Sequence, residues 1–194
     1  RQDNMADRIN SKKKGNRLEL AVTQFMKEWT GYEFSRVPQS GGLRWQNRTS
    51  IAGDVICTDK KHERNCRISI EVKAPKEIAF EHLLLPTKGK NTDKLNHYWD
   101  QCTSDAKAVK KVPMLFIHRN GMAKGTFFVV MNNEVYNEIA RELNFYPVLY
   151  GCISYLSQYR GIVILNSEDL KQINYKDLHK KVFKPYCKII YKTE

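Results

Sequence analysis

The segment from residue 67 to residue 74 constrains the fold of this chain more than any other. Its sequence, Arg-Ile-Ser-Ile-Glu-Val-Lys-Ala, alternates branched apolar residues with polar ones. This period of two predicts a β-strand with one buried face. Glu71 and Lys73 then share the opposite face, and Pro75 limits further pairing. The segment therefore belongs to a sheet that other elements cover on at least one side.

A second predicted strand, residues 53–58, precedes it and carries Asp54, and a polar connection, residues 59–65, joins the two. Two carboxylates on neighbouring strands that point to one side can hold a hard cation such as Mg²⁺, which keeps several waters. Such an ion can polarise a phosphoryl oxygen, and Lys73 can orient the attacking water. Asp54, Glu71 and Lys73 are therefore candidate catalytic residues.

The acid-x-Lys pattern alone has little specificity, since Asp59, Asp105 and Asp169 also precede a lysine at this spacing. Only Glu71 lies within a strand of alternating branched residues. The competing interpretation is an exposed sheet face on which Glu71 and Lys73 form cross-strand ion pairs, each contributing about 0.2–1 kcal/mol. The two strands by themselves leave both interpretations open.

The rest of the chain alternates between helical and strand periods. A helix is predicted after Gly15, because Leu18, Val22, Phe25 and Trp29 fall on one stripe. We also expect helices at residues 93–111 and after Asn132 or Asn133, strands at 32–37, 114–118, 125–131, 162–165 and 187–191, a loop or short helix at 77–90, and no clear element at 145–160. This order predicts an α/β fold with a central mixed β-sheet flanked by helices.

Basic residues outnumber acidic ones by 33 to 21, which gives a net charge of +12 and a pI near 9.5. They gather in residues 1–20, in residues 171–194 and in two shorter clusters near Lys60 and Lys107. Such surfaces attract polyanions through counterion release, without sequence information. We therefore expect a nucleic-acid partner, although charge alone does not separate a nuclease from a module that only binds.

No apolar run approaches the roughly 20 residues needed to span a bilayer, and residues 1–14 lack an apolar signal region. Five cysteines without a Cys-x-x-Cys pair favour a reducing compartment. Cys57, His62 and Cys66 lie close in sequence, but a zinc knuckle would need a fourth ligand and usually tighter spacing. We expect a cytoplasmic protein with no membrane partner.

On these motifs the chain resembles the PD-(D/E)xK nuclease superfamily, and residues 14–74 are similar to archaeal-type and phage Holliday junction resolvases. The segments that carry the resemblance are Lys14-Gly15-Asn16-Arg17-Leu18-Glu19, Arg36-Val37-Pro38-Gln39-Ser40-Gly41, Gly53-Asp54-Val55-Ile56 and Ile70-Glu71-Val72-Lys73. Gln101 also fits a glutamine often found in the helix after the Glu-x-Lys strand. The resemblance implies a restriction-endonuclease-like core.

By this resemblance Asp54 and Glu71 ligate Mg²⁺, with Mn²⁺ able to substitute, and the Val72 carbonyl is a further candidate ligand. Lys73 would position the nucleophilic water, and Glu19 would complete the acidic site directly or through water. The resemblance places Arg36 and Ser40 near the scissile phosphate and gives Arg17 a contact with the DNA backbone. The further candidate DNA-binding residues are Gln101 and the basic run Lys12, Lys13 and Lys14. The implied enzyme is a homodimer whose paired sites nick opposing strands, leaving 5′-phosphate and 3′-hydroxyl ends.

The chain also departs from the resolvases. Gly53 replaces the proline of the motif, a variation expected to permit the same start of the strand. Residues 43–51 form a longer connection than expected. The expected organisation is a flexible basic arm at residues 1–14 and a single nuclease domain at residues 15–194, made of a core at 15–131 and a C-terminal elaboration at 132–194 that matches nothing in the compact resolvases.

Several of these residues also have a simpler structural interpretation. Glu19 could be a surface acid paired with a basic residue of its own helix, and Ser40 could serve a Gly-rich turn. Gln101 could be an ordinary helix-face amide, and Tyr98 and Trp99 are expected to pack in the core rather than stack on bases.

The sequence predicts a Mg²⁺-dependent, structure-selective DNA endonuclease of the Holliday junction resolvase type, acting on four-way or other branched DNA. If a phage encodes it, it would work in the host cytosol. One alternative is an endonuclease with the same core that acts on duplex DNA, in restriction or phage DNA turnover. The other is a non-catalytic basic module that binds nucleic acid.

Overall fold

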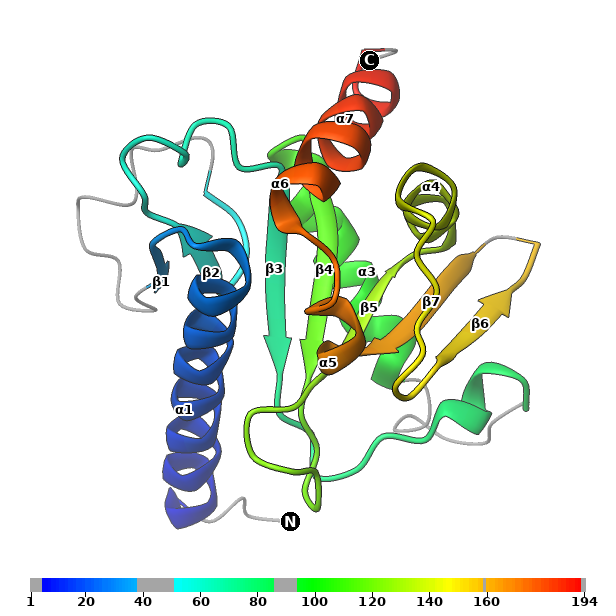
Figure 1. Ribbon diagram of the computed structural model, residues 1–194. Coiled ribbons are helices and arrows are strands. Elements are labelled where there is room, and N and C mark those ends of the chain that lie inside the picture. The colour runs from blue at the N-terminus through cyan, green and yellow to red at the C-terminus, as the bar shows by residue number, and fades with distance from the viewer. Residues whose placement is uncertain (1–4, 38–50, 86–93, 159, 193–194) are drawn as a thin grey trace.

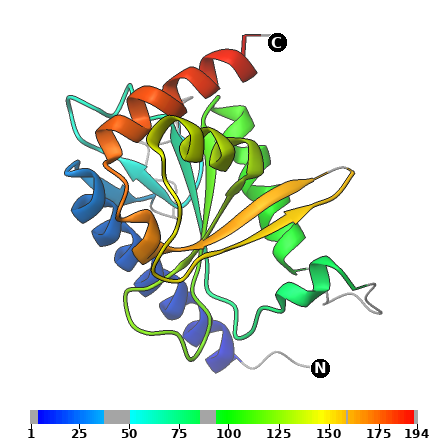
Figure 2. The same cartoon turned by 45° about the vertical axis from the view of Figure 1, so that its right-hand side comes forward.

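The computed structural model describes residues 5–37, 51–85, 94–158 and 160–192, with side chains from Lys13 onward. Its strands form one mixed sheet with helices on both faces (Figures 1 and 2). The strands are β1 (Phe34–Arg36), β2 (Val55–Cys57), β3 (Ile68–Lys73), β4 (Val112–Ile117), β5 (Phe128–Asn132), β6 (Cys152–Leu156) and β7 (Gly161–Asn166). The helices are α1 (Met5–Thr30), α3 (Lys94–Ala108), α4 (Asn133–Leu143), α5 (Ser167–Leu170), α6 (Tyr175–Leu178) and α7 (Lys184–Ile190), with a 3₁₀ turn η1 (Phe80–Leu83) and a π-helical turn η2 (His179–Phe183). The predicted α/β fold with a central mixed sheet is confirmed.

The strand order across the sheet is β1-β2-β3-β4-β5-β7-β6. The neighbours β3 and β4 run parallel, and α3 provides the crossover that a parallel pair requires. The other neighbouring strands pair antiparallel. The expected C-terminal elaboration therefore adds β6 and β7 to the same sheet that carries the predicted site strands β2 and β3.

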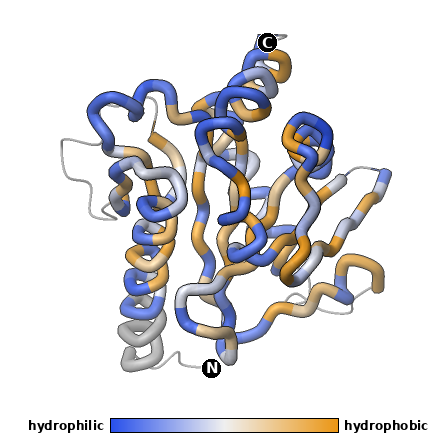
Figure 3. Tube along the Cα trace, viewed as in Figure 1, coloured by the Kyte–Doolittle hydropathy of each residue, from blue (hydrophilic) through white to orange (hydrophobic). Residues whose placement is uncertain are grey.

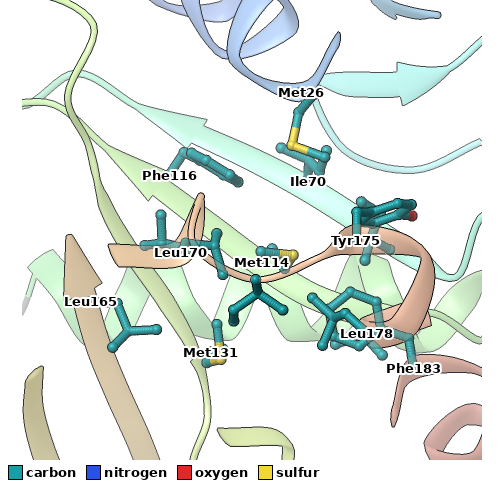
Figure 4. Close-up of a cluster of buried hydrophobic side chains, with 14 of the residues drawn as sticks. Met26, Ile70, Met114, Phe116, Met131, Leu165, Leu170, Tyr175, Leu178 and Phe183 are labelled. Atoms are coloured by element: carbon teal, nitrogen blue, oxygen red, sulfur yellow. The ribbon is translucent and has the colours of Figure 1, made fainter. Parts of the chain in front are cut away.

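Each face of the sheet is covered by its own helical layer. The face formed by Ile68, Ile70 and Val72 packs against α1, α4 and the C-terminal helices, and Figure 3 shows hydrophobic residues following the strands. Met26 of α1 lies next to Ile70 in this cluster (Figure 4). The other face packs against α3 and η1 through a smaller cluster comprising Leu83, Leu95, Trp99, Cys102, Leu115, Ile117, Val130, Ile162 and Ile164.

Helix α1 begins at Met5, so residues 5–14, expected to belong to a flexible arm, are helical. Good helix formers such as alanine, arginine and lysine dominate this stretch, which favours extension of the helix toward the N-terminus. Gly31, at φ +72°, donates its N–H to the Lys27 carbonyl at 2.9 Å and ends the helix. Although α1 is 26 residues long, no helix among the described residues is apolar enough to cross a membrane.

The strand predicted at residues 187–191 is wrong, because this segment belongs to the end of helix α7. Phe183 and Cys187 lie four residues apart and are both buried, and a helix, unlike a strand, turns residues at this spacing toward one core. Pro185 sits in the first turn of α7, where proline is well tolerated. The β-branched residues of this segment thus misled the local prediction.

In residues 145–160, which fitted no clear element, the described part up to residue 158 forms a loop and the edge strand β6. The fully buried carboxylate of Asp169 holds this loop, accepting the N–H groups of Leu149 at 2.8 Å and Tyr150 at 2.9 Å. The segment is therefore tied to the core through its backbone rather than through a periodic apolar face.

Candidate active site

The two predicted metal-binding acids lie beside each other, Asp54 directly before β2 and Glu71 within the neighbouring strand β3. Val55 of β2 pairs with Ile70 of β3, and both side chains are buried in the cluster under α1. Since side chains alternate along a strand, the adjoining residues Asp54 and Glu71 come side by side. The Val72 N–H donates to Asp54 Oδ2 at 2.9 Å and holds this carboxylate against β3. The geometry brings the two acids together rather than splaying them to opposite faces.

Gly53 sets the close approach of these two strands. Its φ is +90°, and a Cβ there would lie 2.3 Å from the Ile70 carbonyl oxygen. The same carbonyl accepts the Asp54 N–H at 2.8 Å. Proline is confined to φ near about −65°, so the expectation that glycine permits the same start of the strand as proline is wrong. Only glycine combines this φ with this lack of space.

Lys73, Glu71 and Gln101 form one hydrogen-bonded network between β3 and α3. Lys73 Nζ lies 2.6 Å from Glu71 Oε1 and donates to Gln101 Oε1 at 2.9 Å. Gln101 Nε2 donates to Glu71 Oε1 at 2.8 Å. Lys73 Nζ also lies 5.6 Å from the centroid of the Tyr98 ring, within cation–π range. The Gln101 amide therefore orients an ammonium and a carboxylate together, which an ordinary helix-face amide would not do.

Burial raises the pKa of both acids. Glu71 is 3% exposed, and burial first and the charge of Asp54 second raise its pKa to about 7, while Lys73 acts in the opposite direction. Burial also raises the pKa of Asp54, whereas the hydrogen bond from the Val72 N–H lowers it. The charge of Asp105 in α3 raises both pKa values further. A cation beside these groups would favour their ionised forms and relieve the repulsion.

Glu19 projects from α1 and pairs with Arg36 of β1. Arg36 Nε donates to Glu19 Oε2 at 2.9 Å, and its Nη2 donates to Asn16 Oδ1 at 3.0 Å. Glu19 is buried, and its pKa is raised by burial and by the charge of Asp54, while Arg36 lowers it. The simpler interpretation, a surface acid paired within its own helix, is therefore wrong. Glu19 and Arg36 form a partly buried pair at the margin of the acidic site.

The predicted DNA-binding residues of α1 line a groove next to this site. Lys13, Lys14 and Arg17 form part of its lining, which encloses a volume of about 710 Å³. Lys124 of the β4–β5 connection contributes a further basic side chain, and Ala74 brings the groove to the end of β3.

Lys14 joins the two sides of this groove. Its Nζ donates to Asn120 Oδ1 at 2.7 Å and to the Pro75 carbonyl at 3.3 Å. The groove therefore opens directly beyond the strand that carries Lys73. Ser40 and the side chain of Lys12, also predicted to bind DNA, lie outside the described residues.

The donor set suits a hard cation. Mg²⁺ is usually held by one or two carboxylates together with waters and substrate phosphates, and Asp54 and Glu71 supply that number. Within the described residues, no three His, Cys, Asp or Glu side chains form a group that could hold a metal. Arg36 holds Glu19 at 2.9 Å, and the role of Glu19 in the metal site, directly or through water, stays a prediction.

Two residues of the site were missed in the sequence. Tyr98 was expected only to pack, yet it lies against Lys73, whereas Trp99 is buried as expected. Asp105 was treated only as a chance match to the acid-x-Lys pattern, yet its charge acts on both site acids. Tyr98, Gln101 and Asp105 are spaced three and four residues apart. That spacing, which places them on one face of a helix, was the available signal.

These features define a class, a restriction-endonuclease-like α/β core in which two acids and a lysine meet on adjacent strands. Residues 10–180 match the family described as "Phage putative PDDEXK endonuclease", and the chain belongs to this family. Protein D14 of Escherichia phage T5 is 25% identical over 125 residues, which cover 64% of this chain and 72% of that protein. No solved structure matches the chain.

Family membership confirms the resemblance to the PD-(D/E)xK superfamily. It supports a nuclease that acts on DNA, and nucleases of this superfamily generally use divalent metals. The resolvase type, the identity of the ion, the form of the DNA and the roles of single residues stay predictions.

Proposed function

We propose that this protein is a Mg²⁺-dependent, structure-selective DNA endonuclease of the Holliday junction resolvase type, acting as a homodimer on branched DNA. The observation that carries the proposal is the convergence of Asp54, Glu71 and Lys73 on one site, with Gln101 joining the last two. Membership of an endonuclease family and the net charge of +12 support it. The resolvase-like segments of residues 14–74 favour a branched substrate.

Each residue of the site has a distinct task in this proposal. Asp54 and Glu71 hold the ion, with the Val72 carbonyl as a further ligand, and bound Mg²⁺ supplies Lewis acidity at the scissile phosphate. Lys73 orients the attacking water and balances the negative charge that grows on the phosphate. Gln101 keeps the Lys73 ammonium in place, since its amide accepts from Nζ at 2.9 Å.

The basic groove gives the DNA backbone a path to this site. Lys13, Arg17 and Lys124 line it, and their charges suit phosphates, which fix position without reading sequence. Its end at Ala74 lies one residue beyond Lys73. We propose that a strand leaving the groove at this end continues to the lysine and the two acids.

A panel of DNA substrates tests the proposal. Four-way junction, linear duplex, flap and single-stranded DNA are each incubated with Mg²⁺ and with a chelator. Nicking of the junction, dependent on Mg²⁺ and much faster than on duplex, is the expected result. Equal cutting of duplex would support the duplex endonuclease instead. If the protein bound DNA but cleaved no substrate with either Mg²⁺ or Mn²⁺, the result would support a non-catalytic nucleic-acid-binding module.

Substitutions in the same assay test the assigned roles. Asp54→Asn and Lys73→Ala should retain junction binding and lose Mg²⁺-dependent nicking. Asp59→Asn is the matched control, because Asp59 also begins an acid-x-Lys sequence but contacts His62, at 2.8 Å, rather than the site. Nicking at the wild-type rate by Asp54→Asn or Lys73→Ala would remove the role of that residue.

A further inference from the structure

The sheet has two edges of different character. β1 is three residues long and carries Arg36, and shortness and charge are features that protect an edge from pairing with other strands. β6, at the other end, is five residues long, and its Ile153 and Leu156 side chains are 46% and 68% exposed. Hydrophobic residues reach this edge in Figure 3. An apolar edge strand of this kind offers an unprotected template for another strand.

The hairpin geometry shows which backbone groups of β6 are available. Ser157 and Arg160 exchange backbone hydrogen bonds at the turn. Since bonded and non-bonded pairs alternate along an antiparallel ladder, Tyr155 and Ile153 direct their N–H and C=O groups toward β7. The residues whose N–H and C=O groups point away from β7 are Cys152, Ser154 and Leu156.

The segment that contains β6 has no charge of its own. Residues 143–159 contain no Asp, Glu, Lys, Arg or His and form the longest uncharged stretch of the chain. The nearest flanking charges are neutralised, because Arg141 pairs with Glu142 and Arg160 pairs with Asp100. The exposed apolar side chains of this stretch are Tyr146, Val148, Leu149, Tyr150, Ile153 and Leu156.

We infer that β6 is the contact between two copies of this chain, paired antiparallel about a two-fold axis at Ser154. A second copy carries the same charge of +12, so two copies repel across their basic surfaces and meet with least repulsion across the uncharged one. A two-fold contact requires a surface that matches itself, and an antiparallel strand centred on Ser154 does so. It pairs Cys152 with Leu156 of the partner subunit.

This contact has a consequence for the site. A two-fold axis perpendicular to the sheet continues it into the second copy, and the Glu71 faces of both copies lie on the same side. The two β3 strands are then nine strand spacings of about 4.8 Å apart, or about 40 Å along the sheet. Two sites facing one DNA suit paired nicking, and this consequence, unlike the contact, rests on the proposed function.

The molar mass of the full chain in solution, measured without DNA over a range of concentrations, tests the contact. The wild type should approach twice 22.7 kDa. Ser154→Pro should be monomeric, because it removes an N–H that points away from β7, a position where an edge strand tolerates proline. Ser154→Ala is the matched control and should stay dimeric.

Two further variants keep the test decisive if Ser154→Pro does not fold. Leu156→Lys places a charge against Cys152 of the partner subunit at each end of the contact and should weaken dimerisation at least tenfold. In a Cys152→Ser background, which removes the exposed native cysteine, Ser154→Cys should form an intermolecular disulfide on oxidation. Paired Cα atoms about 5.5 Å apart meet the requirement of such a bond.

A wild type that stays monomeric, or a dimer that Ser154→Pro and Leu156→Lys both leave unchanged, would overturn the inference. A dimer without the disulfide would overturn the register at Ser154. Cleavage assays on the same samples separate the two proposals. A monomer that nicks DNA would support the nuclease without the homodimer, and a dimer that cleaves no substrate would support the contact without the nuclease.

Discussion

Glu71 and Asp169 are buried carboxylates in the two halves of this molecule, and their partners differ. Glu71 takes hydrogen bonds from the side chains of Lys73 and Gln101 and faces the charge of Asp54. Asp169 takes its hydrogen bonds from two backbone N–H groups of the loop before β6. One carboxylate is held among movable charged groups, and the other is fixed by the peptide chain.

The difference separates a functional acid from a structural one. Each Asp169 oxygen accepts a backbone N–H, so this buried carboxylate fixes the loop that leads to the uncharged edge. Glu71 is buried next to a second acid, which raises its pKa to about 7, and such an arrangement destabilises the fold unless a cation or proton offsets it. Perturbed acids of this kind cluster at active sites. The degree of burial alone does not distinguish Glu71 from Asp169, because both side chains are buried.

The largest effect is expected for Glu71→Gln. Nicking should fall by about 10²–10³-fold, the scale on which single charge-stabilising groups act. The free energy of unfolding should change by less than about 1 kcal/mol, because the amide keeps the shape and removes repulsion with Asp54. Nicking kinetics and urea unfolding measure the two quantities. Normal nicking with a large loss of stability would make Glu71 a structural acid like Asp169.

Asp169→Ala should show the opposite behaviour. Two buried N–H groups lose their acceptor, so the free energy of unfolding should fall by about 2–4 kcal/mol, while nicking per folded molecule stays near the wild-type rate. Asp177→Ala, at an exposed acid of α6, serves as the control and should change neither quantity. If Asp169→Ala lost nicking without losing stability, Asp169 would be a functional acid rather than a structural one.

A smaller effect is expected for Gln101→Ala, which removes a positioning residue rather than a charged one. Loss of its hydrogen bond to the Lys73 ammonium should slow nicking about tenfold, or about 1.4 kcal/mol in activation free energy. Junction affinity should not change. Ser104→Ala, on an exposed position of the same helix, is the control. An equal loss in junction affinity would assign Gln101 to DNA binding instead.

The site strands could be predicted because their signal is local. The alternation of apolar and polar residues at 67–74 predicts β3. The strand predicted at residues 53–58, which carries Asp54, corresponds to β2. Where the local signal and the packing disagree, the prediction fails. Residues 187–191 have strand-forming side chains, yet burial of Phe183 and Cys187 requires a helix.

Edge strand β6 had no usable signal, because it has neither a buried face nor charges that mark an exposed one. Gly53 illustrates a different limit. Its residue type could be compared with the proline of a motif, but its φ of +90° and its 2.3 Å approach to Ile70 arise from how two strands meet. Neither property is visible in a single segment.

The amino-acid sequence alone determined that Glu71 and Lys73 share a face and that Asp54 precedes them on another strand, because side-chain direction in a strand depends only on local backbone geometry. The tertiary structure decided the partners: Arg36 for Glu19, Gln101 for both Glu71 and Lys73, and the charge of Asp105 beside the acids. Such contacts join segments far apart in the chain. They are set by strand register and by the packing of α1 and α3 on the sheet, which no local pattern contains.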